Sequence, residues 1–99
     1  MTVMHTSKAR RIGDYFGGLL SGIEGAKGLW ALQEDGQVEL WLVVDADNMD
    51  AEREFHSLLG RVLAAFPEST IDLRVVNAHR VGEHNAFTAV PGDAVKIEI

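Results

Sequence analysis

Two strongly apolar segments separated by an amphipathic one constrain the fold of this chain more than any other feature. Residues 38–45 (VELWLVVD) and residues 71–76 (IDLRVV) are rich in β-branched and aromatic side chains, which is typical of buried strands. Between them, five apolar residues recur at the spacing of one helix face: Phe55, Leu58, Leu59, Val62 and Phe66. Because a helical crossover normally joins parallel strands, we expect the two segments to be parallel neighbours in one sheet.

The N-terminal part of the chain predicts a further helix. Thr6 or Ser7 can cap it, and an apolar stripe extends it to about Gly25. The stripe consists of Ile12, Phe16, Leu19 and Ile23. Gly13 and Gly17 lie one helical turn apart, and neither has a side chain that would keep a neighbour away. We therefore expect another backbone to approach this helix closely.

Turn residues predict how the strands are connected. Residues 29–32 have the character of a short strand, and Asp35-Gly36 is a favoured dipeptide of two-residue hairpins. We therefore expect this strand to pair antiparallel with residues 37–45. Pro67 should end the amphipathic helix, and residues 70–77 then form the third strand.

The C-terminal part of the chain has weaker signals. Residues 83–90 predict a short helix with Phe87 and Val90 facing inward, and residues 94–99 alternate between apolar and polar, which predicts a terminal edge strand. The complete order is α-β-β-α-β-(α)-β. We therefore expect a single α+β domain over residues 1–99. Its architecture would be a two-layer sandwich, with a mixed sheet of about four strands and helices mainly on one face.

Composition narrows the classes of function. The chain has no cysteine, which excludes disulfide bonds, thiolate catalysis and cysteine-based zinc sites. Its net charge is −6, and eight acidic residues lie between Glu34 and Glu54 against the single base Arg53. Such a surface repels nucleic-acid phosphates, so we expect no DNA partner. No apolar run approaches the roughly 20 residues that span a membrane, and no signal segment is evident. We therefore expect no membrane association and a cytoplasmic location.

Alternation along the strands sorts the side chains of the predicted sheet into two faces. Apolar residues at every second position face the helices, and the opposite face carries Glu39, Trp41, Asp45, Asp72 and Arg74. Glu39 and Asp72 lie on neighbouring strands, and two such carboxylates can share a Mg²⁺ ion, which prefers oxygen ligands. The alternative is that Glu39 or Asp72 pairs with Arg74 on an open sheet face.

The same face carries Trp41 and Val43, and Trp30 of the preceding strand can join them. In so small a protein, large apolar side chains on a sheet face should be buried against another protein surface and not exposed to water. A second copy of the chain or another protein can supply it, which makes these three residues candidates for an interface. The alternative is that residues 79–90 of the same chain fold over them.

The order and spacing of the elements, from about residue 12 to the C-terminus, resemble those of minimal nucleotidyltransferases, small members of the DNA polymerase β-like superfamily. The resemblance is carried by the two strand segments described above and by the closing segment VPGDAVKIEI. In that family, an Asp-x-Asp on the second strand and an Asp on the next strand hold Mg²⁺ and the nucleoside triphosphate. The resemblance places these three ligands at Gln37, Glu39 and Asp72.

Two departures from the family pattern bear on activity. Gln37 is not a carboxylate, and Ala31-Leu32-Gln33 stands where the family has the Gly-Ser that opens its phosphate-binding turn. Phosphoryl transfer depends on metal ions and on contacts to the phosphates. The resemblance therefore implies a degenerate member without catalysis.

These observations lead to two main hypotheses. The first is a non-catalytic nucleotidyltransferase-like domain that acts as a homodimer or beside a protein partner, with no cofactor and no nucleotide expected. The alternative is an active nucleotidyltransferase that holds Mg²⁺ with Glu39 and Asp72, helped by Asp45. A third interpretation is an unrelated α+β domain whose sheet face holds a small ligand.

Overall fold

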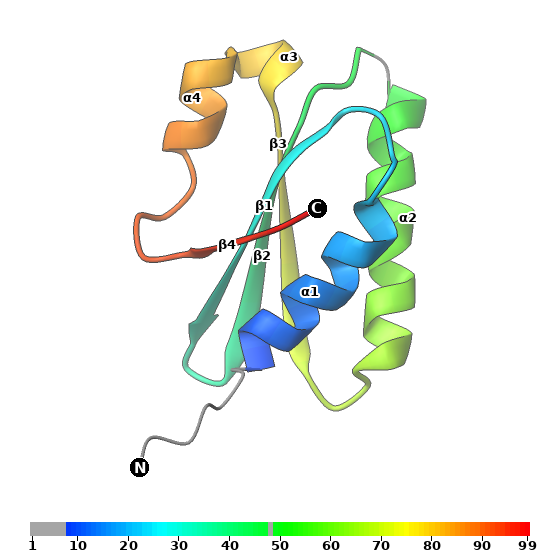
Figure 1. The fold of residues 1–99 in the computed structure, drawn as a ribbon, viewed down its shortest axis with the longest axis vertical. Helices are drawn as coiled ribbons and strands as arrows, with labels where there is room; N and C mark the ends of the chain where they lie inside the picture. Colours follow the sequence, from blue (N-terminus) through cyan, green and yellow to red (C-terminus); the bar gives the residue numbers. More distant parts are fainter. Residues whose placement is uncertain (1–7, 48) are drawn as a thin grey trace.

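The computed structural model describes residues 8–47 and 49–99, which form one four-stranded sheet and four helices (Figure 1). In chain order the elements are α1 (Lys8–Leu20), β1 (Ala26–Glu34), β2 (Gln37–Val44), α2 (Met49–Ala65), β3 (Thr70–Asn77), α3 (Ala78–Val81), α4 (Glu83–Thr88) and β4 (Val95–Ile97). The sheet order is β3-β2-β1-β4. Figure 1 shows α3 and α4 on the side of the sheet away from α2, near one end of the strands. The predicted α+β class and mixed sheet are confirmed.

The pairing of the strands follows the predicted turns. β2 and β3 are parallel along their full length, from Gln37 opposite Thr70 to Val44 opposite Asn77. β1 and β2 are antiparallel, and the two residues between them have positive φ angles, 52° for Asp35 and 77° for Gly36. Positive φ at both positions is the geometry of a type I′ turn, whose twist suits a hairpin. β1 is longer than predicted because it continues pairing with β2 back to Ala26.

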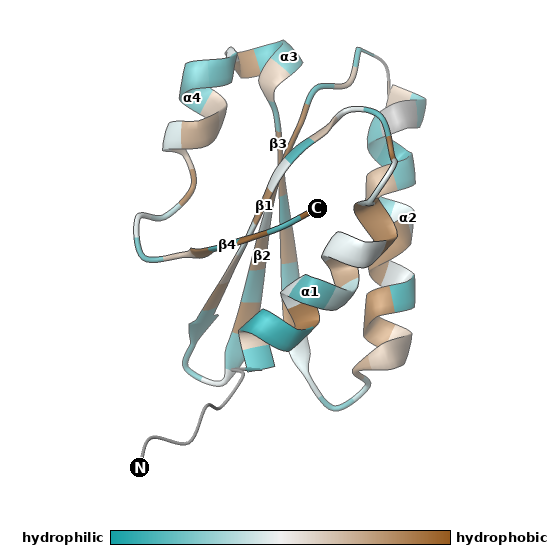
Figure 2. Ribbon diagram, viewed as in Figure 1, coloured by the Kyte–Doolittle hydropathy of each residue, from teal (hydrophilic) through white to brown (hydrophobic). Residues whose placement is uncertain are grey.

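The core lies between the sheet and the two long helices. The β2 side chains on this face are fully buried: Val38, Leu40, Leu42 and Val44. Ile12, Phe16 and Leu20 of α1 pack against them, together with Phe55 and Val62 of α2. Figure 2 shows that polar residues lie on the outer side of α2. The face assignment made from strand alternation is confirmed.

α1 ends earlier than the apolar stripe predicted. The helix stops at Leu20 rather than near Gly25, and the proposed caps Thr6 and Ser7 lie outside the described residues. Gly22 has φ of 82°, a left-handed conformation that commonly terminates helices. Ile23 lies beyond this stop, yet its side chain still packs against the core.

The close backbone approach predicted at α1 is confirmed at Gly17, where the neighbour is the backbone that follows β4, and at Gly13 the neighbour is a side chain of β4. A methyl group added at Gly17 would lie 2.7 Å from the carbonyl oxygen of Glu98, and one added at Gly13 would lie 2.8 Å from the side chain of Ile97. These distances are shorter than van der Waals contact, so the two glycines let the C-terminal strand cross beneath α1.

The segment after β3 folds into two short helices instead of the single one predicted for residues 83–90. Ala86 of α4 is its fully buried residue, while Phe87 and Val90 are half-buried. β4 pairs antiparallel with β1 and forms an edge of the sheet, as predicted, although it spans only three residues. Within the described residues, no helix has the length and apolar character needed to cross a membrane.

Two neighbouring glycines of α1 should respond oppositely to the same substitution. Gly18→Ala should raise the free energy of unfolding by about 0.5–1 kcal/mol, because the position is open and alanine favours helix. Gly17→Ala should lower it by about 1–2 kcal/mol, because the new methyl group meets the backbone of Glu98. Urea denaturation measures both values. Equal stabilisation by the two variants would contradict the close approach of β4.

Candidate functional site

The two carboxylates predicted to hold a metal ion do lie side by side, but each is engaged by a neighbour. Glu39 and Asp72 are directly opposite in the parallel pair of β2 and β3. Asp72 Oδ2 lies 3.1 Å from the Arg74 guanidinium. Glu39 Oε1 accepts a hydrogen bond of 2.5 Å from the indole nitrogen of Trp41. The ion-pair alternative considered for this face is therefore the arrangement that the structure shows.

Asp45 lies away from these carboxylates. It follows β2 six residues after Glu39, which at about 3.3 Å per residue is a separation of about 20 Å. Its carboxylate lies 3.6 Å from Nδ1 of His79. This distance corrects the expectation that Asp45 helps the other two at one metal ion. Among the residues that the structure describes, no group of three or more carboxylate or histidine side chains could hold a metal.

A row of two aromatic and two basic side chains crosses the sheet next to these carboxylates. Arg74, Trp41, Trp30 and Lys96 are successive partners on β3, β2, β1 and β4. The Arg74 guanidinium lies 5.8 Å from the centre of the Trp41 ring, and the Lys96 ammonium lies 5.9 Å from that of Trp30. At these distances each cation is attracted to the face of its indole ring. Both tryptophans are half-buried.

The other end of this sheet face is covered by the chain itself. Val43 is fully buried, and its register partner Gly28 lies beneath the ring of Trp30 and close to Phe87 of α4. Trp30 and Phe87 make an edge-to-face contact with ring centres 5.7 Å apart. Val43 is thus unavailable to a partner, which corrects its prediction as an interface residue. Trp41 and Trp30 keep part of their surface exposed.

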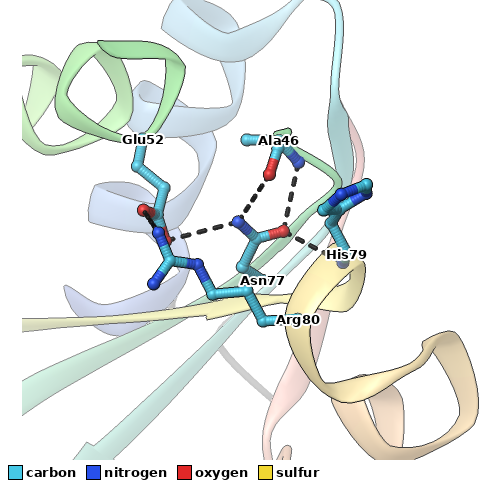
Figure 3. Close-up of polar contacts among 5 residues, drawn as sticks. All are labelled: Ala46, Glu52, Asn77, His79 and Arg80. Atoms are coloured by element: carbon cyan, nitrogen blue, oxygen red, sulfur yellow. Dashed lines mark hydrogen bonds and ion pairs between the residues drawn. The ribbon is translucent and has the colours of Figure 1, made fainter. Parts of the chain in front are cut away.

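A polar cluster gathers where the parallel strands β2 and β3 end (Figure 3). The Asn77 side chain is buried and bonds both backbone groups of Ala46: its amide nitrogen donates to the carbonyl at 2.8 Å, and its oxygen accepts from the N–H at 3.1 Å. The same oxygen accepts from the His79 N–H at 3.0 Å and so caps α3. The amide also donates to Glu52, whose carboxylate pairs with Arg80 at 2.6 Å.

This cluster joins three parts of the chain that are distant in sequence. Asn77 connects the loop after β2 to the first turn of α3, and Glu52 adds the first turn of α2. From the sequence, Asn77 is predicted only as the last residue of a strand. The signal for its role is an asparagine between an apolar strand and a helical segment, since asparagine is a favoured N-cap.

An open pocket of about 360 Å³ lies beside the cluster. Its lining consists of Glu24, Gly25, Lys27, Asp45, Asp47 and His79. Ligands of open α/β sheets often bind at the carboxyl ends of parallel strands, where this pocket lies. Its walls, however, are mainly charged side chains of both signs, without the apolar surface that holds most small ligands. The location alone assigns no ligand to it.

Comparison of this chain with protein-family models, with curated proteins and with solved structures finds no match. The resemblance to minimal nucleotidyltransferases therefore stays a prediction from element order and from the residues at positions 37, 39 and 72. The function has to be inferred from the geometry of the chain's own residues.

Replacing Asn77 should destabilise the fold more than replacing an exposed asparagine. Asn77→Ala leaves both Ala46 backbone groups and the start of α3 without partners, which should cost about 2–4 kcal/mol. Asn85→Ala is the matched control, because Asn85 is exposed and donates a single bond to the Val81 carbonyl; it should cost about 0.5 kcal/mol. Urea denaturation of both variants measures the difference. Similar small losses would show that the cluster contributes little.

Proposed function

We propose that this chain is a non-catalytic nucleotidyltransferase-like domain that acts by associating with protein, either a second copy of itself or a different partner. The observation that carries the proposal is the ion pair between Asp72 and Arg74 at 3.1 Å. It occupies one of the two carboxylates that the resemblance makes metal ligands, and the remaining ligand position is Gln37, an amide.

The ion pair disfavours Mg²⁺ for an electrostatic reason. A guanidinium next to a carboxylate holds positive charge where a divalent cation would have to bind, and like charges in one site repel. Two-metal phosphoryl transfer uses metal ions to neutralise the charge that develops on the phosphates. With Asp72 paired to Arg74 and Glu39 bonded to Trp41, this charge would remain largely uncompensated.

The sheet face next to the ion pair has the composition of an interaction surface. Trp41 and Trp30 are half-buried, and Arg74 and Lys96 flank them. Tryptophan and arginine are the residue types most enriched among the energetically dominant contacts of protein interfaces. These residues support association with protein over transfer chemistry.

Titration calorimetry with nucleoside triphosphates tests the proposal. The parent chain should release no binding heat with ATP at millimolar concentration, with or without Mg²⁺, because the phosphates meet no cradle and the metal meets an occupied carboxylate. The same titration with the other triphosphates extends the test. Heat that depends on Mg²⁺ and disappears in Asp72→Asn would overturn the non-catalytic assignment.

A second candidate is an active Mg²⁺-dependent nucleotidyltransferase, and the direct opposition of Glu39 and Asp72 is the observation that favours it. Under this candidate, Glu39→Gln and Asp72→Asn should each abolish transfer of a labelled nucleotide and leave the fold intact. Glu68→Gln, an exposed substitution elsewhere, is the matched control and should retain activity. Absence of transfer by the parent chain, or equal transfer by all four proteins, would eliminate this candidate.

A further inference from the structure

The outer edge of β3 is open. β3 is the terminal strand of the sheet, and among the described residues its only strand neighbour is β2. Its eight residues pair with β2 without a bulge, so the opposite edge presents a regular row of unpaired backbone N–H and C=O groups. Such an edge is a template for another strand.

β3 lacks several of the features that protect an edge strand. It contains no proline and no bulge, and its charged residues Asp72 and Arg74 lie on the face opposite the helices, where Ile71, Leu73 and Val75 are all apolar. The opposite edge of the sheet is formed by β4, which has three residues and carries Lys96. Only one edge of this sheet is therefore long and regular.

The apolar core is incomplete along this edge. Val38, Leu40 and Leu42 of β2 are fully buried, whereas their β3 partners Ile71, Leu73 and Val75 are half-buried. The difference shows that the helix layer covers β2 completely and β3 in part. An additional strand with its own helix layer would complete the cover.

α2 extends the same apolar surface. Glu52 marks the side of α2 that faces β3, because it bonds Asn77 at the end of that strand. Leu59 and Leu63 follow seven and eleven residues later, which places them on the same side of the helix. Leu59 is half-buried and Leu63 is 40% exposed. Apolar residues of α2 and β3 thus form one surface, which we call the β3 edge surface: Leu59, Leu63, Ile71, Leu73 and Val75.

We propose that a second copy of this chain pairs with the open edge, β3 against β3 in antiparallel orientation, with Leu73 opposite Leu73. This inference rests on the proposed function and names its partner and surface. A two-fold axis through the Leu73 pair makes one continuous eight-stranded sheet. It also brings the two α2 helices to the same face, because residues opposite each other in antiparallel strands share a face.

The charges of β3 select this register. With Leu73 opposite Leu73, Asp72 of each copy faces Arg74 of the other, so two attractive pairs form. In the two nearest registers that keep the apolar side chains of both strands on the helix face, either Asp72 lies opposite Asp72 or Arg74 lies opposite Arg74. Like charges directly opposite destabilise a strand pair, and opposite charges stabilise it. The same register sets Ile71 against Val75 on the helix face, so apolar side chains meet there as well.

The symmetric placement of Asp72 and Arg74 about Leu73 favours pairing with a second copy of the chain over pairing with an unrelated strand. An isologous interface requires a surface that is complementary to itself, and one acid and one base placed symmetrically about Leu73 meet that requirement. The Arg74 guanidinium lies near the Trp41 ring of β2, yet 53% of its side chain and 41% of the Asp72 side chain are exposed, so a neighbouring strand can reach both.

Two experiments test the pairing: measuring the mass of the chain in solution, and exchanging the charges at positions 72 and 74. The parent chain, of 10.8 kDa, should have twice that mass in analytical ultracentrifugation. Asp72→Arg and Arg74→Asp should each weaken the dimer about tenfold or more, because both facing pairs become repulsive. The double variant with both changes should restore it. Circular dichroism of each variant checks that the fold is kept. A parent chain of monomer mass, or a double variant no better than the single ones, would overturn the proposal.

Cysteine cross-linking tests the register, and the chain has no cysteine of its own. Asp72→Cys and Arg74→Cys should form a covalent dimer only when the two variants are mixed, because position 72 faces position 74 of the other copy. Each variant alone should stay uncross-linked. In the proposed register the two cysteines at the same position in the two copies are offset by two residues along the strands, which is beyond the reach of a disulfide bond. A cross-link in either variant alone would overturn this register.

The two proposals fail on different measurements. Nucleotide-dependent heat in calorimetry overturns the non-catalytic function whatever the mass of the chain. A monomeric chain that binds no nucleotide overturns the β3 pairing alone, and the open edge would then be left to a strand of a different protein.

Discussion

The position of β2 between two neighbours is the constraint on which the rest of the structure depends. β2 pairs with β1 along one edge and with β3 along the other, and its helix-facing side chains are fully buried. A strand buried in this way is stable only beneath a complete helix layer, so α1 and α2 both have to cover it. Since α2 also connects β2 to β3, the crossover makes these strands parallel and brings their carboxyl ends together.

The same constraint explains why β1 gains a second neighbour, β4, whereas β3 gains none among the described residues. At the end of β3, Asn77 bonds the loop after β2 and caps α3, so the chain turns to the opposite face of the sheet. There it covers Val43 and contacts Trp30. It returns to the sheet only as β4, beside β1. No strand in the part of the chain that the structure describes pairs with the outer edge of β3.

The features that could be predicted from sequence are those with a strong local pattern. Residues 70–77 form the predicted strand, and the Asp35-Gly36 hairpin turn is where the dipeptide indicated it. The predictions that needed correction depend on the positions of distant residues. Asp45 is separated from Glu39 by the length of the strand between them, and the burial of Val43 depends on a segment more than thirty residues later, whose weak periodicity predicted little. Asn77 bonds a backbone 31 residues away, which no local pattern reports.

Asp72 and Arg74 connect the two proposals made for this chain. A carboxylate that holds a metal ion has to keep its oxygen atoms free of competing cations, whereas an edge strand that pairs with its own copy benefits from an acid and a base two positions apart. The two demands conflict at Asp72, because the arginine that makes β3 self-complementary also neutralises the carboxylate. Under the two proposals, the absence of a metal ion and the pairing of two copies would both follow from the same pair of side chains.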